Sequence, residues 1–240
     1  MKVVLLSGST RSNSRTNVVR NQIRESLKKK FGDNIHIQCF DQTNLNAGLC
    51  LGCNTCFFTG KCVLDQKKGD HIEDLKKALK EADLIYLLSP VYFHQVSGAM
   101  KTFIDRLSYW THLISLTGKV GVTVSVSSNN GNEFVNCYLE KFADNLGLLT
   151  ISNLSLLMDQ DTSEEKDKKI EQSTNEVYDF FAGNRKVPVS QNQSIKFLVY
   201  KQKYEDLGVG AEYQYWQNNS YFEYSDFSDL WLSKHNKVKV

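Results

Sequence analysis

Four of the six cysteines are crowded into one short segment of the chain. They are Cys50, Cys53, Cys56 and Cys62, in the pattern C-x2-C-x2-C-x5-C, a compact spacing of the kind that a [4Fe-4S] cluster needs. A zinc ion is a second interpretation, although two x2 gaps that share a central cysteine are tight for a tetrahedral site. A redox pair of thiols is a third. In the fourth, Gly52 and Gly60 shape a loop whose thiols pack as small apolar groups without metal.

A polar loop, residues 7–17, joins an apolar run to a stretch with helical spacing. The N-terminus of a helix presents unpaired N–H groups and a partial positive charge, which favour a bound phosphate. The side chains that can add donors or positive charge are Ser9, Arg11, Ser14, Arg15 and Thr16. The loop has neither a Walker A pattern nor the Gly-x-Gly-x-x-Gly of a dinucleotide fold. We therefore predict a phosphomonoester site, the alternative being a Ser/Asn turn that only caps the helix.

Two more polar segments follow expected strands. The first runs Ser89, Pro90, Val91, Tyr92, Phe93 and His94, and continues through Ser97-Gly98 to Lys101-Thr102-Phe103-Ile104-Asp105-Arg106-Leu107. The second reads Ser127, Ser128, Asn129, Asn130 and Gly131. The first, together with Gly8-Ser9-Thr10-Arg11 and Thr16, resembles the signatures of the flavodoxin-like NADPH-dependent FMN reductase family, over roughly residues 2–180.

In that family the loop after the third strand holds the isoalloxazine ring and ribityl chain of FMN. The resemblance therefore implies that Pro90 stiffens this loop, and that an aromatic ring lies near the flavin face. It implies backbone contacts from Val91, Tyr92 and Phe93, with His94 as a polar contact to the flavin or its substrate, or as a catalytic group. The segment at Ser127, Ser128, Asn129 and Gly131 replaces a glycine-rich turn of the relatives, and we expect it at the pyrimidine edge of the ring.

The function implied is that of an FMN-dependent oxidoreductase. NAD(P)H would reduce the flavin, and a small acceptor such as a quinone, a free flavin or an azo compound would reoxidise it. The cysteine pattern also resembles that of iron-sulfur flavoproteins, so an electron carrier with a cluster, serving a protein partner, is the alternative. A flavodoxin-type carrier is disfavoured because its usual strong acidity is absent at a net charge of +2. The resemblance also implies a homo-oligomer.

The elements that must position these loops alternate along the chain. Strands are expected at residues 2–7, 35–40, 84–88, 120–126 and 148–156, with amphipathic helices between them and a last helix at 164–181. Strands that alternate with helices indicate a parallel sheet covered on both faces. Five strands of this kind predict an α/β fold, a flavodoxin-like doubly wound parallel sheet, over residues 1–183.

Residues 184–240 form an aromatic-rich C-terminal extension. Ile195–Tyr204 and Glu212–Phe222 are expected to be strands around Gly208 and Gly210, so the extension is predicted to contain β structure. It either binds a specific partner or covers an edge of the sheet or a second subunit.

Composition excludes several other classes of protein. The balance of 29 basic and 27 acidic residues gives no reason to expect nucleic-acid binding or attraction to a membrane surface. No apolar run reaches the ~18 residues of a membrane span, and the opening residues look like a strand rather than a signal peptide. We therefore expect a cytoplasmic protein.

Overall fold

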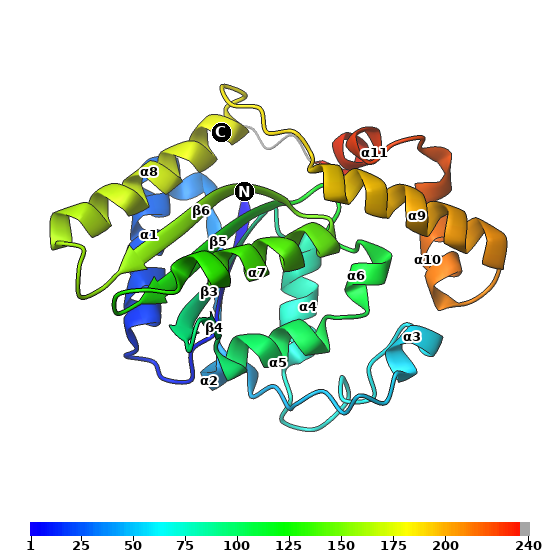
Figure 1. Cartoon of the computed structure of the whole chain (residues 1–240), viewed down its shortest axis with the longest axis horizontal. Helices are drawn as coiled ribbons and strands as arrows, with labels where there is room; N and C mark the ends of the chain where they lie inside the picture. Colours follow the sequence, from blue (N-terminus) through cyan, green and yellow to red (C-terminus); the bar gives the residue numbers. More distant parts are fainter. Residues whose placement is uncertain (236–240) are drawn as a thin grey trace.

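The fold is seen in a computed structural model, which describes residues 1–235 (Figure 1). Its parallel strands follow the order β2-β1-β3-β5-β6, which is the flavodoxin-like doubly wound order. They span Lys2–Ser7 (β1), His36–Phe40 (β2), Leu84–Tyr92 (β3), Val120–Ser127 (β5) and Leu149–Leu157 (β6). The predicted five-stranded parallel sheet is confirmed. An unpredicted sixth strand, β4 (Gln95–Val96), pairs antiparallel with the end of β3.

Successive side chains of the strands point to opposite faces of the sheet and build two apolar clusters. On β1, Val3 and Leu5 join one cluster, whereas Val4 and Leu6 join the other. The first face is covered by α1 (Arg15–Phe31) and α8 (Ser163–Phe181). The second face is covered by α4 (Ile72–Glu81), α5 (Gly98–Arg106) and α7 (Asn132–Leu146), as Figure 1 shows.

The other elements of the body are short. They are α2 (Gln42–Leu45), α3 (Thr55–Thr59), α6 (Trp110–Leu113) and a 3-10 turn at Gly32–Asn34. Both α2 and α3 lie in the long segment between β2 and α4 that holds the clustered cysteines.

The C-terminal extension is helical, so the prediction of β structure there was wrong. It consists of α9 (Gln191–Leu207), α10 (Ala211–Asn218), a 3-10 turn at Tyr221–Glu223, and α11 (Phe227–Lys234). Ser190 and Gln193 form a capping box that begins α9, and Gly208, in the left-handed conformation, ends it. Phe197 and Tyr204 lie on the same side of α9, because seven residues make about two helical turns, and both side chains are buried.

The extension packs on the body of the protein. Its buried rings belong to the same apolar cluster as the sheet residues Val122 and Leu154. At the end of α11, a Cβ on Gly118 would lie 2.5 Å from the carbonyl carbon of Lys234. The backbone of the extension is therefore in close contact with the backbone of the body at this point. No helix in residues 1–235 is both long and apolar enough to cross a bilayer.

Candidate functional site: loops at the carboxyl edge of the sheet

The loops after β1, β3 and β5 meet at the carboxyl edge of the sheet. The Ser97 hydroxyl, at the start of α5, donates to the carbonyl of Gly8 in the first loop over 2.5 Å. A Cβ on Gly8 would lie 2.6 Å from Cβ of Met100, so only glycine allows this approach. Gly131, in the third loop, is equally close to the second, because a Cβ there would lie 2.9 Å from Cγ1 of Val91. In a doubly wound sheet this edge is where ligands bind.

The first loop is held together by its own hydroxyl groups. Ser14 caps α1, its Oγ accepting from the backbone N–H of Asn17 over 3.1 Å. Ser9 donates to Oγ of Ser14 over 2.6 Å, and Ser9 and Thr16 are buried. The buried hydroxyls therefore shape the predicted phosphate loop, and the N-terminal N–H groups of α1 remain the main donors for an anion.

The two arginines of this loop occupy different positions. Arg15 bridges the first and third loops, since its Nη1 donates to the Ser128 hydroxyl over 3.2 Å and pairs with Asp159 at 2.9 Å. Arg11 is exposed and has no carboxylate within ion-pair distance among residues 1–235. Of the two predicted cations, Arg11 is thus the one whose charge is available to an anionic ligand.

A buried network behind this loop was not foreseen from the sequence. The Asn17 amide donates to the Arg11 carbonyl over 2.9 Å and to the Asp41 carboxylate over 3.1 Å, and Arg20 pairs with Asp41 at 2.7 Å. Burial by itself raises the pKa of Asp41, but hydrogen bonds from Thr43 and Arg20 bring it below its ordinary value. The Asp41-x-x-Asn44 capping box of α2 is the sequence signal that could have indicated this position.

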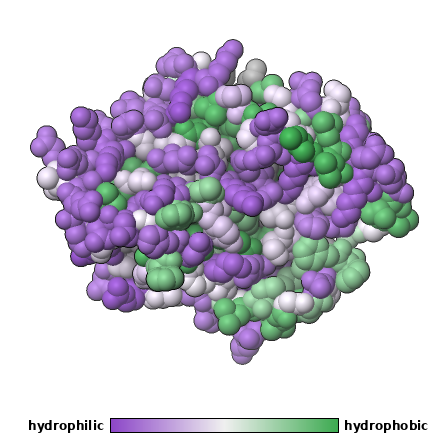
Figure 2. Space-filling view, in the orientation of Figure 1, coloured by the Kyte–Doolittle hydropathy of each residue, from purple (hydrophilic) through white to green (hydrophobic). Residues whose placement is uncertain are grey.

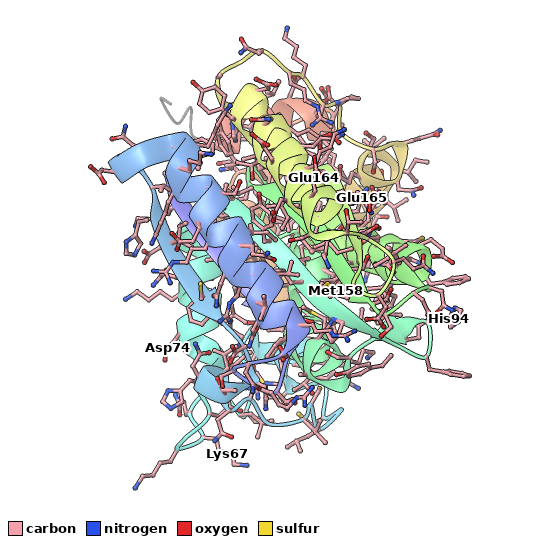
Figure 3. All side chains as sticks on the ribbon, turned by 90° about the vertical axis from the view of Figure 1, so that its left-hand side faces the viewer. Lys67, Asp74, His94, Met158, Glu164 and Glu165 are labelled. Carbon is pink, nitrogen blue, oxygen red and sulfur yellow. The ribbon has the colours of Figure 1, made fainter. Side chains whose placement is uncertain are left out.

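The second loop is a tight hairpin between β3 and β4. Tyr92 pairs with Gln95, which leaves Phe93 and His94 as a two-residue turn with φ of 48° and 60°. Both positive values define a type I′ turn, which normally uses Asn and Gly, so two bulky residues here are strained. Phe93 is 98% exposed, and the His94 ring lies 5.2 Å from that of Phe134 on α7. Pro90 is buried at the base of the hairpin. His94 lies at the outer edge of the molecule in Figure 3.

The third loop is partly buried against the second. Ser127 is buried, and its hydroxyl bonds to the side chain of Asn132 over 2.5 Å. Gly131 has φ of 82° and precedes α7, while Ser128 and Asn129 are exposed. Of the predicted donors, Ser128 and Asn129 thus face outward, and Ser127 supports the loop from inside.

The four clustered cysteines line a single pocket of about 320 Å³. Asp105 and Ser108, at and just beyond the end of α5, complete one wall. The Gly52 N–H donates to Sγ of Cys50 over 3.5 Å. Burial raises the pKa of the Cys56 thiol and the neighbouring Cys62 raises it further, whereas hydrogen bonds from Thr55 lower the pKa of Cys53. The loop therefore brings together the thiols that the sequence spacing singled out.

The positions of the thiols bear on the zinc interpretation. Within residues 1–235 no three His, Cys, Asp or Glu side chains are grouped closely enough to hold one metal ion. A tetrahedral zinc site needs four ligands around one centre, whereas the thiolates of a [4Fe-4S] cluster each bind a different iron. Within residues 1–235, the thiols as positioned are therefore not arranged around one metal ion.

The base of the cysteine loop is closed by Arg106, whose side chain is fully buried. Its Nη1 donates to the carbonyl of Gly48 over 3.1 Å and pairs with Asp70 at 2.5 Å, and its Nη2 pairs with Asp65 at 3.3 Å. Asp65 also accepts from the backbone N–H of Cys62 over 3.2 Å. Arg106 thus ties both ends of the loop to α5. The sequence motif contained this residue, but spacing alone gave it no role.

Apolar side chains surround the cysteine pocket. Leu49, Leu51 and Phe58 are 75%, 66% and 79% exposed. Figure 2 shows hydrophobic surface along the lower right margin, where Figure 1 places α3 and the cysteine loop. Solvent exposure is one of the factors that set the reduction potential of an iron-sulfur cluster, so an apolar rim bears directly on such a site.

Several known proteins are similar to this chain in sequence. The family model of NADPH-dependent FMN reductases matches residues 1–163. An iron-sulfur flavoprotein of Archaeoglobus fulgidus is 26% identical over 227 residues, which cover 92% of this chain and 100% of that protein. One of Methanocaldococcus jannaschii is 36% identical over 135 residues, which cover 55% of this chain and 66% of that protein.

Solved structures resemble the chain in fold. The apo form of an NADH:FMN oxidoreductase has a TM-score of 0.56 at 18% identity, over 75% of this chain and 87% of that one. An FMN-dependent NADH-azoreductase from Bacillus anthracis, in complex with FMN, has a TM-score of 0.58 at 12% identity, over 74% of this chain and 99% of that one.

Proposed function

Because the chain belongs to the NADPH-dependent FMN reductase family, we propose that it is a flavin-dependent oxidoreductase that carries an iron-sulfur cluster as well as FMN. The observation that carries the proposal is that Cys50, Cys53, Cys56 and Cys62 line one pocket. The names of two relatives, both iron-sulfur flavoproteins, give independent support.

The residues of the three loops fit FMN. The N–H groups at the start of α1 and the charge of Arg11 suit the phosphate. The hairpin backbone from Val91 to Phe93 and the exposed Ser128 and Asn129 suit the isoalloxazine ring. When bound, FMN exchanges electrons in pairs or singly, and the chain's part is to bind and orient it. His94 stays a proposed contact to the flavin or its substrate.

The cysteine loop fits a [4Fe-4S] cluster, which exchanges single electrons. The four thiols would be the ligands, Gly52 supplies an N–H to one sulfur, and Arg106 fixes the ends of the loop. Both sites adjoin α5, since Ser97 at its start touches the first flavin loop and Arg106 at its end holds the cysteine loop. We propose NAD(P)H as the electron donor, since the family reduces FMN with NADPH, and a protein as the final acceptor, since a cluster would pass on single electrons.

A visible absorption spectrum of the anaerobic protein, recorded before and after NADPH, tests the cluster. We expect a broad brown absorbance beneath the flavin bands, which is lost in the Cys53→Ser variant while FMN remains. Cys137→Ser is the matched control, because this exposed cysteine lies on α7 outside the loop. Identical spectra of the wild-type protein and Cys53→Ser would contradict the proposal.

A second candidate function is direct reduction of a small planar acceptor at the flavin. The observation that favours it is the aromatic surface beside the hairpin, where Tyr92, Phe93 and Phe134 are exposed. Steady-state turnover with a quinone separates the two functions. If Cys53→Ser keeps the full quinone reductase rate, the small acceptor reacts at the flavin and needs no cluster.

We also propose that the protein is a homo-oligomer and that it is located in the cytoplasm. Analytical ultracentrifugation would establish the number of subunits.

A further inference from the structure

The cysteine loop contains one helical turn that is weakly stabilised by its own residues. This turn, α3, has five residues, and Cys56 lies within it. Its N-cap residue Asn54 has φ of 57° and makes no capping hydrogen bond with its side chain. Short helices are marginal in water without outside contacts. Contacts from elsewhere in the fold must therefore fix α3, and with it the thiol of Cys56.

One of the outside contacts is made by His112 of α6. Its ring lies edge-on to that of Phe57, the residue after Cys56, with 4.8 Å between ring centres. On another side the His112 ring lies 5.5 Å from the ring of Tyr200 on α9. His112 thus stands between the cysteine loop and the C-terminal extension.

The extension fixes the position of His112 through polar groups. Nδ1 of His112 and Oε1 of Glu212, the second residue of α10, are 2.8 Å apart. The His112 carbonyl accepts from the hydroxyl of Tyr204 over 3.3 Å and from Nε1 of Trp216 over 3.2 Å. Tyr204 and Trp216 are fully buried, so these two donors are held by the core. Both the ring and the backbone of His112 are therefore set by the extension.

The first turn of α10 also lies directly against the end of α3. Gly60, which ends α3 in a left-handed conformation, would carry a Cβ 4.0 Å from Cβ of Ala211. Figure 1 shows α10 beside α3 with α6 adjacent, although well over a hundred residues of sequence separate α3 from α10.

From these contacts we infer that the C-terminal extension is a structural part of the cysteine site, with Glu212 as a positioning residue that acts through His112 on Phe57 and Cys56. The inference rests on the proposed function in one respect, that the ordered thiols hold a cluster. It gives the extension a role that neither edge covering nor partner binding supplies. The extension holds the cysteine loop in the conformation that would bind the cluster.

The test compares the Glu212→Ala variant with the wild-type protein, both prepared without a cluster. Alkylation of each cysteine by iodoacetamide is followed by peptide mass spectrometry, with Cys137 as the internal reference. Loss of the Glu212 contact should let α3 open locally, so we expect Cys56 to react about fivefold faster. Glu212→Gln keeps an oxygen that can accept from Nδ1 of His112, and it should restore slow alkylation. Glu223→Ala, an exposed carboxylate of the extension, is the matched control.

The second readout is the lifetime of the cluster after reconstitution with ferrous iron and sulfide. We expect Glu212→Ala to lose iron to a chelator about fivefold faster than Glu223→Ala, with FMN affinity unchanged. Equal alkylation and equal iron loss in Glu212→Ala and the wild type would overturn the inference. So would faster alkylation of all cysteines together with loss of FMN, which would indicate general destabilisation. If the wild type takes up no cluster, the proposed function fails, and the alkylation rates still decide the role of Glu212.

Discussion

At the scale of single residues, two glycines determine how closely the loops of the proposed flavin site approach one another. Because Gly8 has no Cβ, α5 can pack closely against the first loop. For the same reason, Gly131 lets the hairpin pack closely against the third loop. At Gly131 the backbone is also left-handed, with φ of 82°, a conformation that costs an L-residue about 1–2 kcal/mol. A methyl group at this position therefore both strains the chain and separates two loops.

We predict that Gly131→Ala weakens FMN binding about tenfold, because the new Cβ would press on Val91 and shift the hairpin, and a tenfold change corresponds to about 1.4 kcal/mol. Fluorescence titration of the apoprotein with FMN measures the dissociation constant. Gly183→Ala is the matched control, since Gly183 has φ of 80° with no atom within 4 Å of its Cβ position. If both variants bind FMN alike, close approach of the loops does not govern affinity.

Asp41 should contribute to stability in a pH-dependent manner. Its pKa is lower in the folded protein than in an unfolded chain, so the stabilisation is present above the unfolded value of about 4 and is lost as the pH falls through the folded value. We predict that Asp41→Asn destabilises the protein by about 1–3 kcal/mol at pH 7, and that this difference shrinks below about pH 4.

Urea unfolding at pH 7 and at about pH 3 measures the effect of Asp41→Asn on the free energy of unfolding. Glu81→Gln serves as the control, because Glu81 pairs with Lys2 on the surface, where an ion pair contributes little. A difference between wild type and Asp41→Asn that stays constant from pH 7 to pH 3 would show that the Arg20–Asp41 pair is not the cause.

At the scale of elements, the β3–β4 hairpin combines a strained turn with an exposed ring. Asn-Gly is the favoured sequence for a type I′ turn, so the double variant Phe93→Asn/His94→Gly should relieve strain of about 1–2 kcal/mol. We predict a rise in Tm of about 2–6 °C. The same variant should lower turnover with NADPH, because it removes two side chains that we propose to lie next to the flavin. Differential scanning calorimetry and steady-state kinetics record both changes, and unchanged Tm would mean that the turn is not strained.

The sequence was informative where an element depends on local periodicity. Strands β1 to β6, apart from β4, were predicted because buried parallel strands are continuous apolar runs. The helices of the extension were missed because aromatic residues also favour strands, although Ser190 and Gln193 form a helix-capping pair. β4 was missed because two residues carry too little pattern, and its pairing depends on the turn at Phe93 and His94.

The candidate site was predictable in its loops and less so in its supports. The spacing of the four cysteines predicted thiols that share one loop, because a cluster needs its ligands close together. Ser14 precedes a stretch with helical spacing, and it caps that helix. The supporting residues contact partners that are distant in the sequence, as seen for Arg106, Asp41 and the His112–Glu212 pair. A single sequence does not show which distant residues come into contact. The same long-range contacts assign a role to the extension.

At the scale of the whole molecule, the extension and the sheet share one apolar cluster. Trp216 is fully buried and stacks on Phe197, with 5.5 Å between ring centres. We predict that Trp216→Ala destabilises the protein by about 3–5 kcal/mol, and that the extension and body still unfold in one transition. Far-ultraviolet circular dichroism and tryptophan fluorescence should therefore give coincident denaturation curves. Two separated transitions would show that residues 184–240 unfold separately from the body.

The most direct test of the central claim is the content of iron, acid-labile sulfide and FMN in one sample purified and reconstituted without oxygen. The account predicts about four irons, about four sulfides and about one FMN per chain. It also predicts that a variant with all four loop cysteines changed to serine keeps the FMN and loses the iron. A protein that binds FMN but no iron, or a quadruple variant that retains its iron, would contradict the assignment of the cysteine pocket.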